Sequence, residues 1–333
     1  MKEIKMNNVL LQVINLVTCF PLEKTKLFQK TPFLCAVNGV SFDLKKGETL
    51  GLVGESGCGK TTTGRSILRL VEPTAGQILF EDEDVSVLTG QDMRAFRRSA
   101  QMVFQDPFAS LNPRMTVGDI VEEPLLIHGL HRNRAERKDL VASVLKKVGL
   151  EPDYMKRFPH EFSGGQRQRI GIARVLTLNP KLVVADEPVS ALDVSIQAQI
   201  INLMVRLQEE FNISYLFISH DLAVVEHISH RVAIMYLGKI VEIAPAENIY
   251  AKPAHPYTKA LLSAIPVPDP RSRIKGMVLR GDIPNPADPP SGCTFRTRCP
   301  IAEDVCSREV AEMREIGPDH LAACHALQPA GAE

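Results

Sequence analysis

Residues 54–61 read Gly-Glu-Ser-Gly-Cys-Gly-Lys-Thr, and no other segment restricts the possible folds of this chain as strongly. An apolar strand pattern over residues 48–53 precedes the segment, and a helix pattern begins near Lys60. Glycine tolerates backbone angles that other residues avoid, so the loop can curl until several N–H groups and a helix N-terminus point at one place. A strand–loop–helix unit of this kind binds phosphate groups, and we predict a site for a nucleoside triphosphate.

The polar side chains of this phosphate loop have distinct predicted tasks. Lys60 supplies a mobile cation for the β- and γ-phosphates, and the hydroxyl of Thr61 ligates magnesium. We interpret Cys58 as a small space-filling side chain, and the alternative is that it makes the site sensitive to alkylation. The predicted nucleotide-binding residues of the loop are Gly54, Glu55, Ser56, Gly57, Cys58, Gly59, Lys60, Thr61 and Thr62.

Length and charge narrow the functional classes. The 333 residues include 39 basic and 39 acidic side chains, so the chain has no formal net charge. No global field therefore draws it to nucleic acid or to anionic lipid, and we expect no nucleic-acid partner. The length suffices for one large domain or two modest ones.

The apolar runs of the sequence are short. None reaches the roughly 18–20 residues that a membrane-spanning helix needs. Residues 1–22 contain early lysines and an apolar stretch, but Gln12 and Asn15 interrupt it and no small-residue cleavage site follows. We interpret this segment as a first strand rather than a signal peptide, and we expect a cytosolic chain that reaches the membrane only through a partner.

Hydrophobic periodicity indicates alternating strands and helices. Short runs rich in Val, Ile and Leu predict buried strands at residues 49–53, 101–104, 182–185 and 214–218. Helical patterns occur near residues 60–70, 134–149, 165–178 and 195–211. This alternation is typical of an α/β core with a mainly parallel sheet.

Two regions depart from the alternation and define the expected domains. Residues 111–180 are helical throughout and predict a helical subdomain inserted into the α/β core. After about residue 262, prolines become too dense for regular elements up to Pro290. We therefore predict a nucleotide-binding domain over residues 1–264 and a Pro-rich linker with a Cys-rich extension over residues 265–333.

The strand pattern at residues 182–187 ends in two adjacent carboxylates, Asp186 and Glu187. On a strand that ends beside the phosphate loop, Asp186 would hold magnesium and Glu187 would act as the base that orients the attacking water. Two solvated acids at a strand end are the alternative. The segment Pro-Val-Ser-Ala-Leu-Asp at residues 188–193 makes that alternative improbable.

Four of the seven cysteines lie at or after residue 293, at positions Cys293, Cys299, Cys306 and Cys324. Disulfides are disfavoured in a reducing cytosol, and zinc usually takes cysteines paired two to four residues apart. Four thiolates at wider spacing suit an iron–sulfur cluster. Spacing alone favours iron–sulfur over zinc only modestly and leaves both open.

Six motifs, taken in order, resemble the ATP-binding cassette family over roughly residues 9–262. They are the phosphate loop, Val-Phe-Gln-Asp-Pro at 103–107 around Gln105, Ser-Gly-Gly-Gln at 163–166, Asp186-Glu187, Ser-Ala-Leu-Asp at 190–193 and Ile-Ser-His-Asp at 218–221. The resemblance implies a phosphate-loop α/β core with an N-terminal antiparallel β part and an inserted helical subdomain.

The same resemblance implies how these motifs cooperate. Cassettes of this family act as head-to-tail dimers with two ATP molecules between them, so the signature at Ser163, Gly164, Gly165 and Gln166 serves the partner's ATP. The resemblance also implies Asp193 as a nucleotide-binding residue. Gln105 would contact magnesium and the attacking water, and His220 would contact the γ-phosphate and Glu187, although a lone histidine is more often a surface or core residue.

Adenine is commonly stacked on an aromatic ring upstream of the phosphate loop in this family. Phe20, at the end of the predicted first strand, is our candidate for that ring, and Phe33 is the alternative. Either side chain could instead belong to the core.

The chain also resembles the ATPases of oligopeptide and dipeptide permeases, and the match to the dipeptide-permease F-type ATP-binding subunits runs over nearly its whole length. The resemblance rests on Pro-Ala-His-Pro-Tyr-Thr at 253–258, the proline-rich linker, the cysteine tail, Leu-Asn-Pro-Arg at 111–114 and Glu-Pro-Leu-Leu at 123–126. In that family the extension can hold a [4Fe–4S] cluster, which implies Cys293, Cys299, Cys306 and Cys324 as ligands in a structural role.

The resemblance implies an ATPase that powers import of di- or oligopeptides. Its expected partners are a paralogous D-type cassette, two transmembrane permease subunits and an extracytoplasmic peptide-binding protein, at the cytoplasmic face of the inner membrane as a peripheral protein. Alternatives are import of another solute such as a nickel complex, export, or a soluble cassette acting on ribosomes or DNA. The last usually needs a second cassette or a long coiled coil, and the sequence has neither.

Overall fold

The structure is a computed structural model that describes residues 8–22, 32–106, 110–131, 133–265 and 281–328. In chain order its elements are β1 (Val9–Pro21), β2 (Phe33–Lys45), β3 (Thr49–Val53), α1 (Lys60–Ile67), β4 (Ala75–Phe80), β5 (Glu83–Asp84), η1 (Val85–Val87), α2 (Gly90–Ser99), β6 (Ala100–Val103), α3 (Val117–Ile127), α4 (Arg134–Lys147), η2 (Pro152–Lys156), η3 (Pro159–Glu161), α5 (Gly164–Leu176), β7 (Leu182–Asp186), α6 (Val194–Phe211), β8 (Ser214–Ser219), α7 (Leu222–Ile228), β9 (Arg231–Tyr236), β10 (Lys239–Pro245), α8 (Ala246–Ala251), α9 (Pro256–Ser263), α10 (Val305–Arg308), β11 (Arg314–Gly317) and β12 (His320–Ala322). The predicted strands and helices of the core all occur, with ends shifted by a few residues.

The chain forms two compact units that interleave along the sequence. The first unit comprises residues 1–11, 44–48 and 80–218, and the second comprises residues 12–43, 49–79 and 219–333. The predicted domains are separated at one point in the sequence, between residues 264 and 265, whereas the two compact units each consist of several segments. The predicted domain boundary therefore stays a prediction.

The first unit contains three parallel strands. β7 pairs with β6 on one side and with β8 on the other, so that Val183 lies between Gln101 and Tyr215. Every residue of β7 and β8 is buried. Continuous runs of Val, Leu and Ile form such strands because both faces of the sheet are covered, which is why the sequence pattern predicts them without alternation.

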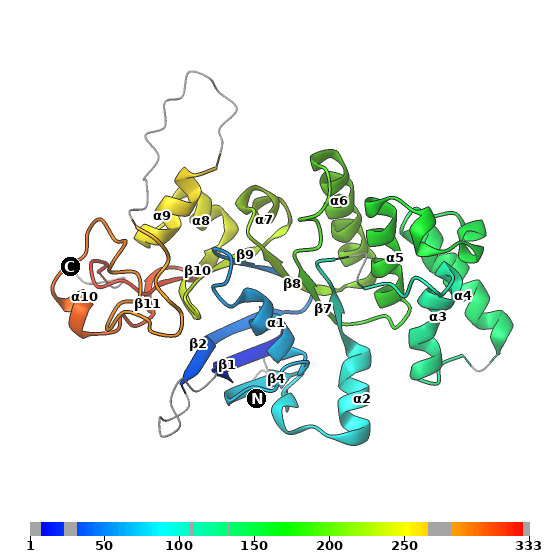
Figure 1. Cartoon of the computed structure of the whole chain (residues 1–333), viewed down its shortest axis with the longest axis horizontal. Coiled ribbons are helices and arrows are strands. Elements are labelled where there is room, and N and C mark those ends of the chain that lie inside the picture. The colour runs from blue at the N-terminus through cyan, green and yellow to red at the C-terminus, as the bar shows by residue number, and fades with distance from the viewer. Residues whose placement is uncertain (1–7, 23–31, 107–109, 132, 266–280, 329–333) are drawn as a thin grey trace, which may run out of the picture. The chain divides into compact units, whose positions relative to one another are not determined.

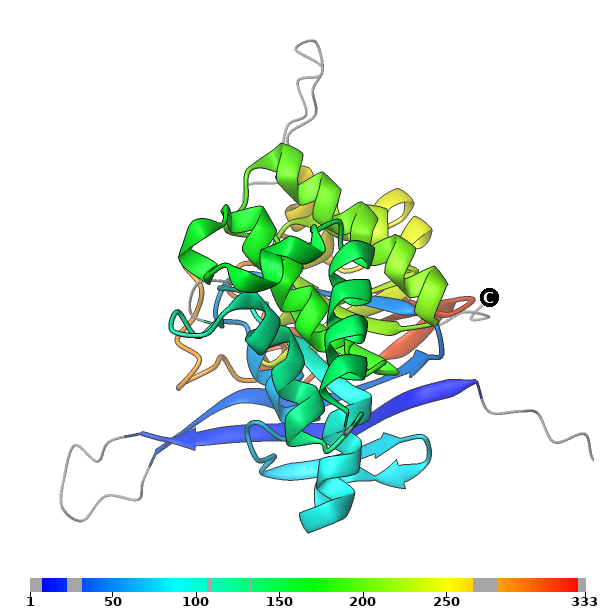
Figure 2. The same cartoon turned by 90° about the vertical axis from the view of Figure 1, so that its right-hand side faces the viewer.

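The region of the predicted helical subdomain contains a group of helices in the first unit. α3 packs against α4 and α5, and α4 also packs against α5. Figure 1 shows these three helices in green, and Figure 2 looks onto the same group. Among the described residues from 111 to 180 there is no strand.

The second unit holds the strand that leads into the phosphate loop. β3 is buried along its whole length and pairs in parallel with β9. β9, β10, β12 and β11 then follow in antiparallel pairs, so the strands of this unit are mixed in direction rather than mainly parallel. β2, β1 and β4 lie side by side in a separate sheet.

The C-terminal extension contributes to the second unit. Its β11–β12 hairpin joins β10, with Ala322 opposite Glu242. The sequence pattern does not indicate this hairpin, because two strands of three or four residues give too little periodicity to detect. Residues 281–290 contain no helix or strand, as their prolines predict, and residues 266–280 lie outside the described part of the chain.

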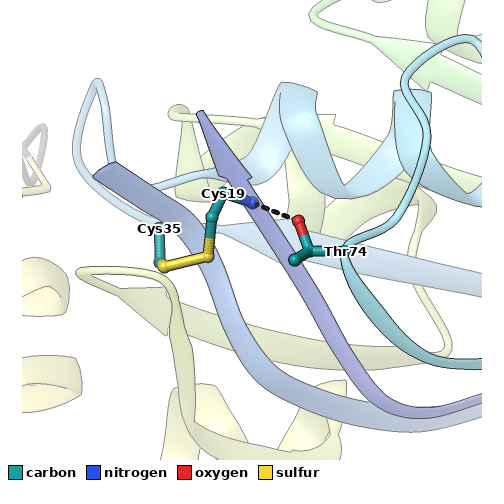
Figure 3. The surroundings of a disulfide bond; sticks show 3 residues. All are labelled: Cys19, Cys35 and Thr74. Carbon is teal, nitrogen blue, oxygen red and sulfur yellow. Dashed lines mark hydrogen bonds between the residues drawn. A yellow bond between two sulfur atoms is a disulfide. The ribbon is translucent and has the colours of Figure 1, made fainter. Parts of the chain in front are cut away.

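A disulfide links Cys19 of β1 to Cys35 of β2 (Figure 3). The backbone N–H of Cys19 also donates to the hydroxyl of Thr74 at 2.9 Å. The sequence gives no sign of this bond, because the two cysteines are 16 residues apart and only the pairing of β1 with β2 brings them together. Among the described residues no helix is both long and apolar enough to cross a bilayer.

Candidate functional site

The phosphate loop connects β3 to α1 in the second unit and lies against β9. A Cβ atom on Gly54 would lie 2.1 Å from the carbonyl oxygen of Met235, so only glycine fits there. Gly59 is the N-cap of α1 and has a φ of 107°. The loop therefore has the backbone course that its sequence predicts, with the N-terminus of α1 at its end.

Lys60 is only 5% exposed, and its ammonium group is held by the loop itself. Its Nζ donates to the carbonyl oxygens of Gly54 at 2.7 Å and Glu55 at 3.0 Å. Cys58 lies beside it and is buried, and this burial raises the pKa of its thiol. A buried, protonated thiol reacts slowly, which supports the space-filling interpretation of Cys58 over the alkylation-sensitive one.

Glu55 connects the phosphate loop to two residues that are not among the predicted site residues. Its N–H donates to the hydroxyl of Tyr257 at 3.0 Å, and its carboxylate accepts hydrogen bonds from Arg298 at 2.7 and 3.0 Å. Tyr257 and Arg298 occur within segments that carry the permease resemblance. Nothing in the sequence indicates that they meet the phosphate loop, because the separations are 202 and 243 residues.

The first unit brings together two of the predicted catalytic residues. Gln105 Nε2 donates to Glu187 Oε2 at 2.8 Å. Glu187 follows β7 directly and has a φ of 45°, an uncommon backbone conformation for a non-glycine residue, with its N–H bonded to the carbonyl oxygen of Ile218 at 2.9 Å. Asp186, the predicted magnesium ligand, is 1% exposed at the end of β7. Backbone strain of this kind clusters at functional sites.

The signature residues form the start of α5 in the first unit. Ser163 is the N-cap: its hydroxyl accepts from the N–H of Gln166 at 3.4 Å, and Gln166 Oε1 accepts from the N–H of Ser163 at 3.0 Å. A Cβ on Gly165 would lie 2.4 Å from a methyl carbon of Ile196, so this glycine also allows α5 to approach α6. Asp193 is the N-cap residue of α6.

The other predicted residues lie in the second unit with the phosphate loop. His220 follows β8 and precedes Asp221, which caps α7 through hydrogen bonds to two backbone N–H groups. Phe20 is 37% exposed and Phe33 is 57% exposed, so both rings are open to a ligand. The sequence also predicts coupling contacts with membrane subunits in the loop after Gln105, at residues 107–113, and residues 107–109 of this loop lie outside the described residues.

The four C-terminal cysteines influence one another electrostatically. Burial raises the pKa of Cys293, Cys299 and Cys324, and neighbouring thiols of the same set raise each of these pKa values further. Within the part of the chain that is described, however, no group of three or more His, Cys, Asp or Glu side chains is arranged to hold a metal ion. The structure therefore supports neither the predicted [4Fe–4S] cluster nor the zinc alternative.

Comparison with known proteins places these features in a family. A family model described as ABC transporter matches residues 37–190, and one described as oligopeptide/dipeptide transporter, C-terminal region, matches residues 241–306. The oligopeptide transport ATP-binding protein AppF of Bacillus subtilis is 57% identical over 309 residues, which cover 92% of this chain and 94% of AppF. A putative peptide import ATP-binding protein of Brucella ovis is 60% identical over 288 residues, which cover 86% of this chain and 90% of that protein.

Solved structures agree with the predicted α/β phosphate-loop fold and confirm it. The ATP-binding cassette MJ0796, in a dimeric post-hydrolysis state with ADP and Pi, has a TM-score of 0.63 and 28% identity, covering 71% of this chain and 98% of its own. CbiO1 of Clostridium perfringens has a TM-score of 0.64 and 26% identity, covering 74% of this chain and 92% of its own. The chain therefore belongs to the ATP-binding cassette (ABC) transporter family, among the members that carry the oligopeptide/dipeptide transporter C-terminal region.

Proposed function

We propose that this chain is an ATPase subunit that powers import of di- and oligopeptides as part of an ABC transporter. The observation that carries the proposal is the extent of the similarity: relatives named for peptide import align over most of the chain, and the C-terminal region typical of oligopeptide/dipeptide transporters matches as well. The intact cassette motifs support hydrolysis rather than nucleotide binding alone.

In this proposal the phosphate loop binds the triphosphate through its backbone N–H groups and Lys60. Thr61 and Asp186 would hold magnesium, since hydroxyl and carboxylate oxygens are the ligands it prefers, and the metal would neutralise phosphate charge. Glu187 accepts a proton from water as the water oxygen attacks the γ-phosphorus and the bond to ADP breaks. The contact with Gln105 supports this role, because it fixes one oxygen of that carboxylate.

The signature at the N-terminus of α5 would act on the ATP of a second cassette. Its capped Ser163 and adjacent glycine N–H groups suit a phosphate, because a helix N-terminus favours negative charge. The dimeric state of MJ0796 with ADP and Pi supports a dimer of cassettes as the active form. We propose a paralogous D-type cassette as the partner, with His220 contacting the γ-phosphate and Phe20 stacking on adenine.

The remaining partners follow from the proposed task. Two transmembrane permease subunits would bind this chain at the cytoplasmic face of the inner membrane, and an extracytoplasmic peptide-binding protein would deliver the cargo to them. In such an assembly, closure of the cassette dimer on ATP changes the permease conformation, and hydrolysis resets it.

The transport assignment is tested with the chain in its assembly. A tagged copy is purified from its own host with the membrane subunits that accompany it, and the complex is placed in proteoliposomes with the binding protein. We expect ATP-dependent uptake of a labelled tripeptide, abolished by Lys60→Ala. Uptake of a nickel complex without peptide uptake would contradict the peptide assignment, and recovery of the chain with ribosomes instead of membrane subunits would contradict transport.

We propose that Cys293, Cys299, Cys306 and Cys324 hold a [4Fe–4S] cluster with a structural role. The donor set supports this, because thiolates are the usual ligands of such clusters and neighbouring thiols raise the pKa values of Cys293, Cys299 and Cys324. Purification without oxygen, followed by assays of iron, acid-labile sulfide and zinc, provides the test. We expect about four irons and four sulfides per chain, and their loss in Cys293→Ser. Zinc or no metal in the wild-type chain would contradict the cluster.

A further inference from the structure

Glu55 of the phosphate loop is held by all three of its polar groups. Its N–H donates to the Tyr257 hydroxyl at 3.0 Å, and its carbonyl oxygen accepts from Lys60 Nζ at 3.0 Å. Its carboxylate accepts from both terminal nitrogens of Arg298 at 2.7 and 3.0 Å. Two of these three partners come from the C-terminal part of the chain, so residues outside the cassette motifs fix a residue inside the phosphate loop.

The ion pair between Glu55 and Arg298 is of a strong kind. The side chain of Arg298 is 7% exposed and that of Glu55 is 24% exposed, so solvent screens the pair less than it screens a surface pair. Two parallel N–H···O bonds join a planar guanidinium to a carboxylate, which fixes direction as well as distance. Such a pair fixes the position of the Glu55 side chain in addition to neutralising its charge.

An aromatic cluster holds Arg298 in place. Phe295 is 1% exposed, and its ring centre lies 5.3 Å from that of Tyr236 and 5.4 Å from that of Tyr257. Three residues later, the N–H of Arg298 donates to the carbonyl oxygen of Phe295 at 3.0 Å. The segment that contains both residues is therefore docked by Phe295 into the cluster, and Tyr257 of the same cluster reaches the N–H of Glu55.

We propose that Arg298 and Tyr257 are positioning residues for ATP, acting through Glu55. A phosphate loop binds with backbone N–H groups whose directions depend on every residue of the loop, and Lys60 is anchored to the carbonyl oxygen of Glu55. Holding Glu55 from outside keeps the loop and Lys60 arranged for the triphosphate before it arrives. The inference rests on the proposed ATPase function and assigns the C-terminal extension a part in nucleotide affinity.

The test measures the Kd of Mg-ATP for the full-length chain by calorimetry. We expect Arg298→Met to raise the Kd about tenfold and Tyr257→Phe to raise it about threefold. Arg298→Lys should raise the Kd by a factor between these two values. The matched control is Arg296→Met, because Arg296 belongs to the same segment but bonds to Ser291 instead. We expect its Kd to stay within about twofold of wild type.

A double-mutant cycle separates positioning from general loss of structure. If Arg298 acts through Glu55, Arg298→Met changes the Kd by less than about twofold in a Glu55→Ala background. An equal loss in both backgrounds, or a lowered melting temperature with an unchanged Kd, would overturn the proposal. Failure of the wild-type chain to bind ATP would overturn the proposed function instead, so the two failures are distinguishable.

Discussion

Gln105 donates a hydrogen bond from Nε2 to Oε2 of Glu187 at 2.8 Å, although the two residues are 82 positions apart in the sequence. The parallel pairing of β6 with β7 explains the contact, because parallel strands end at the same edge of a sheet. Gln105 follows the end of β6 and Glu187 follows the end of β7. The first unit thus holds the amide of Gln105 and the carboxylate of Glu187 in contact with each other.

Glu187→Gln should abolish turnover while ATP still binds. The amide cannot accept the proton of the attacking water, so we expect the ATPase rate of the assembled transporter to fall by about 10²–10⁴-fold. We expect the Kd of ATP to stay within about twofold. Glu209→Gln, at an exposed position of α6, is the matched control and should leave the rate unchanged. Near-normal hydrolysis in Glu187→Gln would show that the base has been assigned to the wrong residue.

Gln105→Ala should lower kcat more than it lowers ATP affinity. The substitution removes the donor that fixes the Glu187 carboxylate but leaves the carboxylate in place. We therefore expect a loss of about tenfold in kcat, smaller than that of Glu187→Gln. The double variant should be no slower than Glu187→Gln alone. An additive loss in the double variant would mean that Gln105 acts independently of Glu187.

Glu242→Gln should destabilise the second unit. This carboxylate is 0% exposed and accepts from the N–H groups of Ala254 at 2.7 Å and His255 at 2.9 Å and from Nε2 of His320 at 2.7 Å. An amide would turn an NH₂ group toward one of these donors, so we expect a loss of about 3 kcal/mol in the free energy of unfolding. Denaturant unfolding of the full chain measures it.

The control for this change is Glu247→Gln, at an exposed position of α8. We expect it to alter the free energy of unfolding by less than about 0.5 kcal/mol. Because His320 belongs to β12, Glu242 also joins the C-terminal hairpin to β10. Equal stability of Glu242→Gln and Glu247→Gln would contradict a structural role for the buried carboxylate.

His255 should make the stability of the chain fall with acid. Burial, with Lys259 adding to it, lowers the pKa of this histidine to about 4. The unfolded chain binds the same proton near pH 6.5, so between these values the unfolded state holds more protons and stability decreases as pH falls. The neutral His255 contributes about 3 kcal/mol to the free energy of unfolding above about pH 6.5. This contribution decreases as the pH falls and is lost by about pH 4.

The variant His255→Asn tests this prediction. In the wild-type chain Nδ1 of His255 accepts from the N–H of Tyr257 at 3.1 Å at the N-terminus of α9, and the asparagine side chain keeps an acceptor there without a group that titrates. The measurement is the free energy of urea unfolding of wild type and His255→Asn from about pH 7 to pH 4. We expect a shallower pH dependence in the variant. Parallel curves for the two proteins would exclude His255 as the source.

The disulfide between Cys19 and Cys35 should stabilise the oxidised chain. It closes a loop with a sequence separation of 16, for which chain entropy gives a stabilisation of about 3 kcal/mol. We expect dithiothreitol to lower the melting temperature of wild type and to have a smaller effect on the Cys19→Ser/Cys35→Ser double variant. Identical responses to the reductant would contradict a stabilising bond at this position.

The sequence predicted the local secondary structure of several segments of the candidate site. The phosphate loop, the strand that ends at Asp186 and the capped helix that begins after Ser163 occur where their patterns predict. Each depends on a few adjacent residues: glycines that permit a tight loop, an apolar run that forms a buried strand, and a serine with a glutamine three residues later that caps a helix. Neighbouring residues determine such features, which can therefore be predicted without knowledge of the tertiary structure.

Other parts of the molecule depend on long-range packing. The ion pair between Glu55 and Arg298, the hydroxyl of Tyr257 on the phosphate loop and the disulfide between Cys19 and Cys35 join positions 243, 202 and 16 residues apart. None is visible as a pattern, because hydrophobic periodicity reports which face of an element is buried and not which element covers it.

Neighbouring residues in the amino-acid sequence thus specify the chemical groups of the candidate site: a phosphate loop, two carboxylates at a strand end and a signature at a helix N-terminus. The contacts of the C-terminal extension, in which β12 pairs with β10 and Arg298 pairs with Glu55, are visible only in the folded chain. This difference arises because neighbouring residues set the backbone geometry, whereas a buried ion pair forms only where packing brings distant charges together and shields them from water.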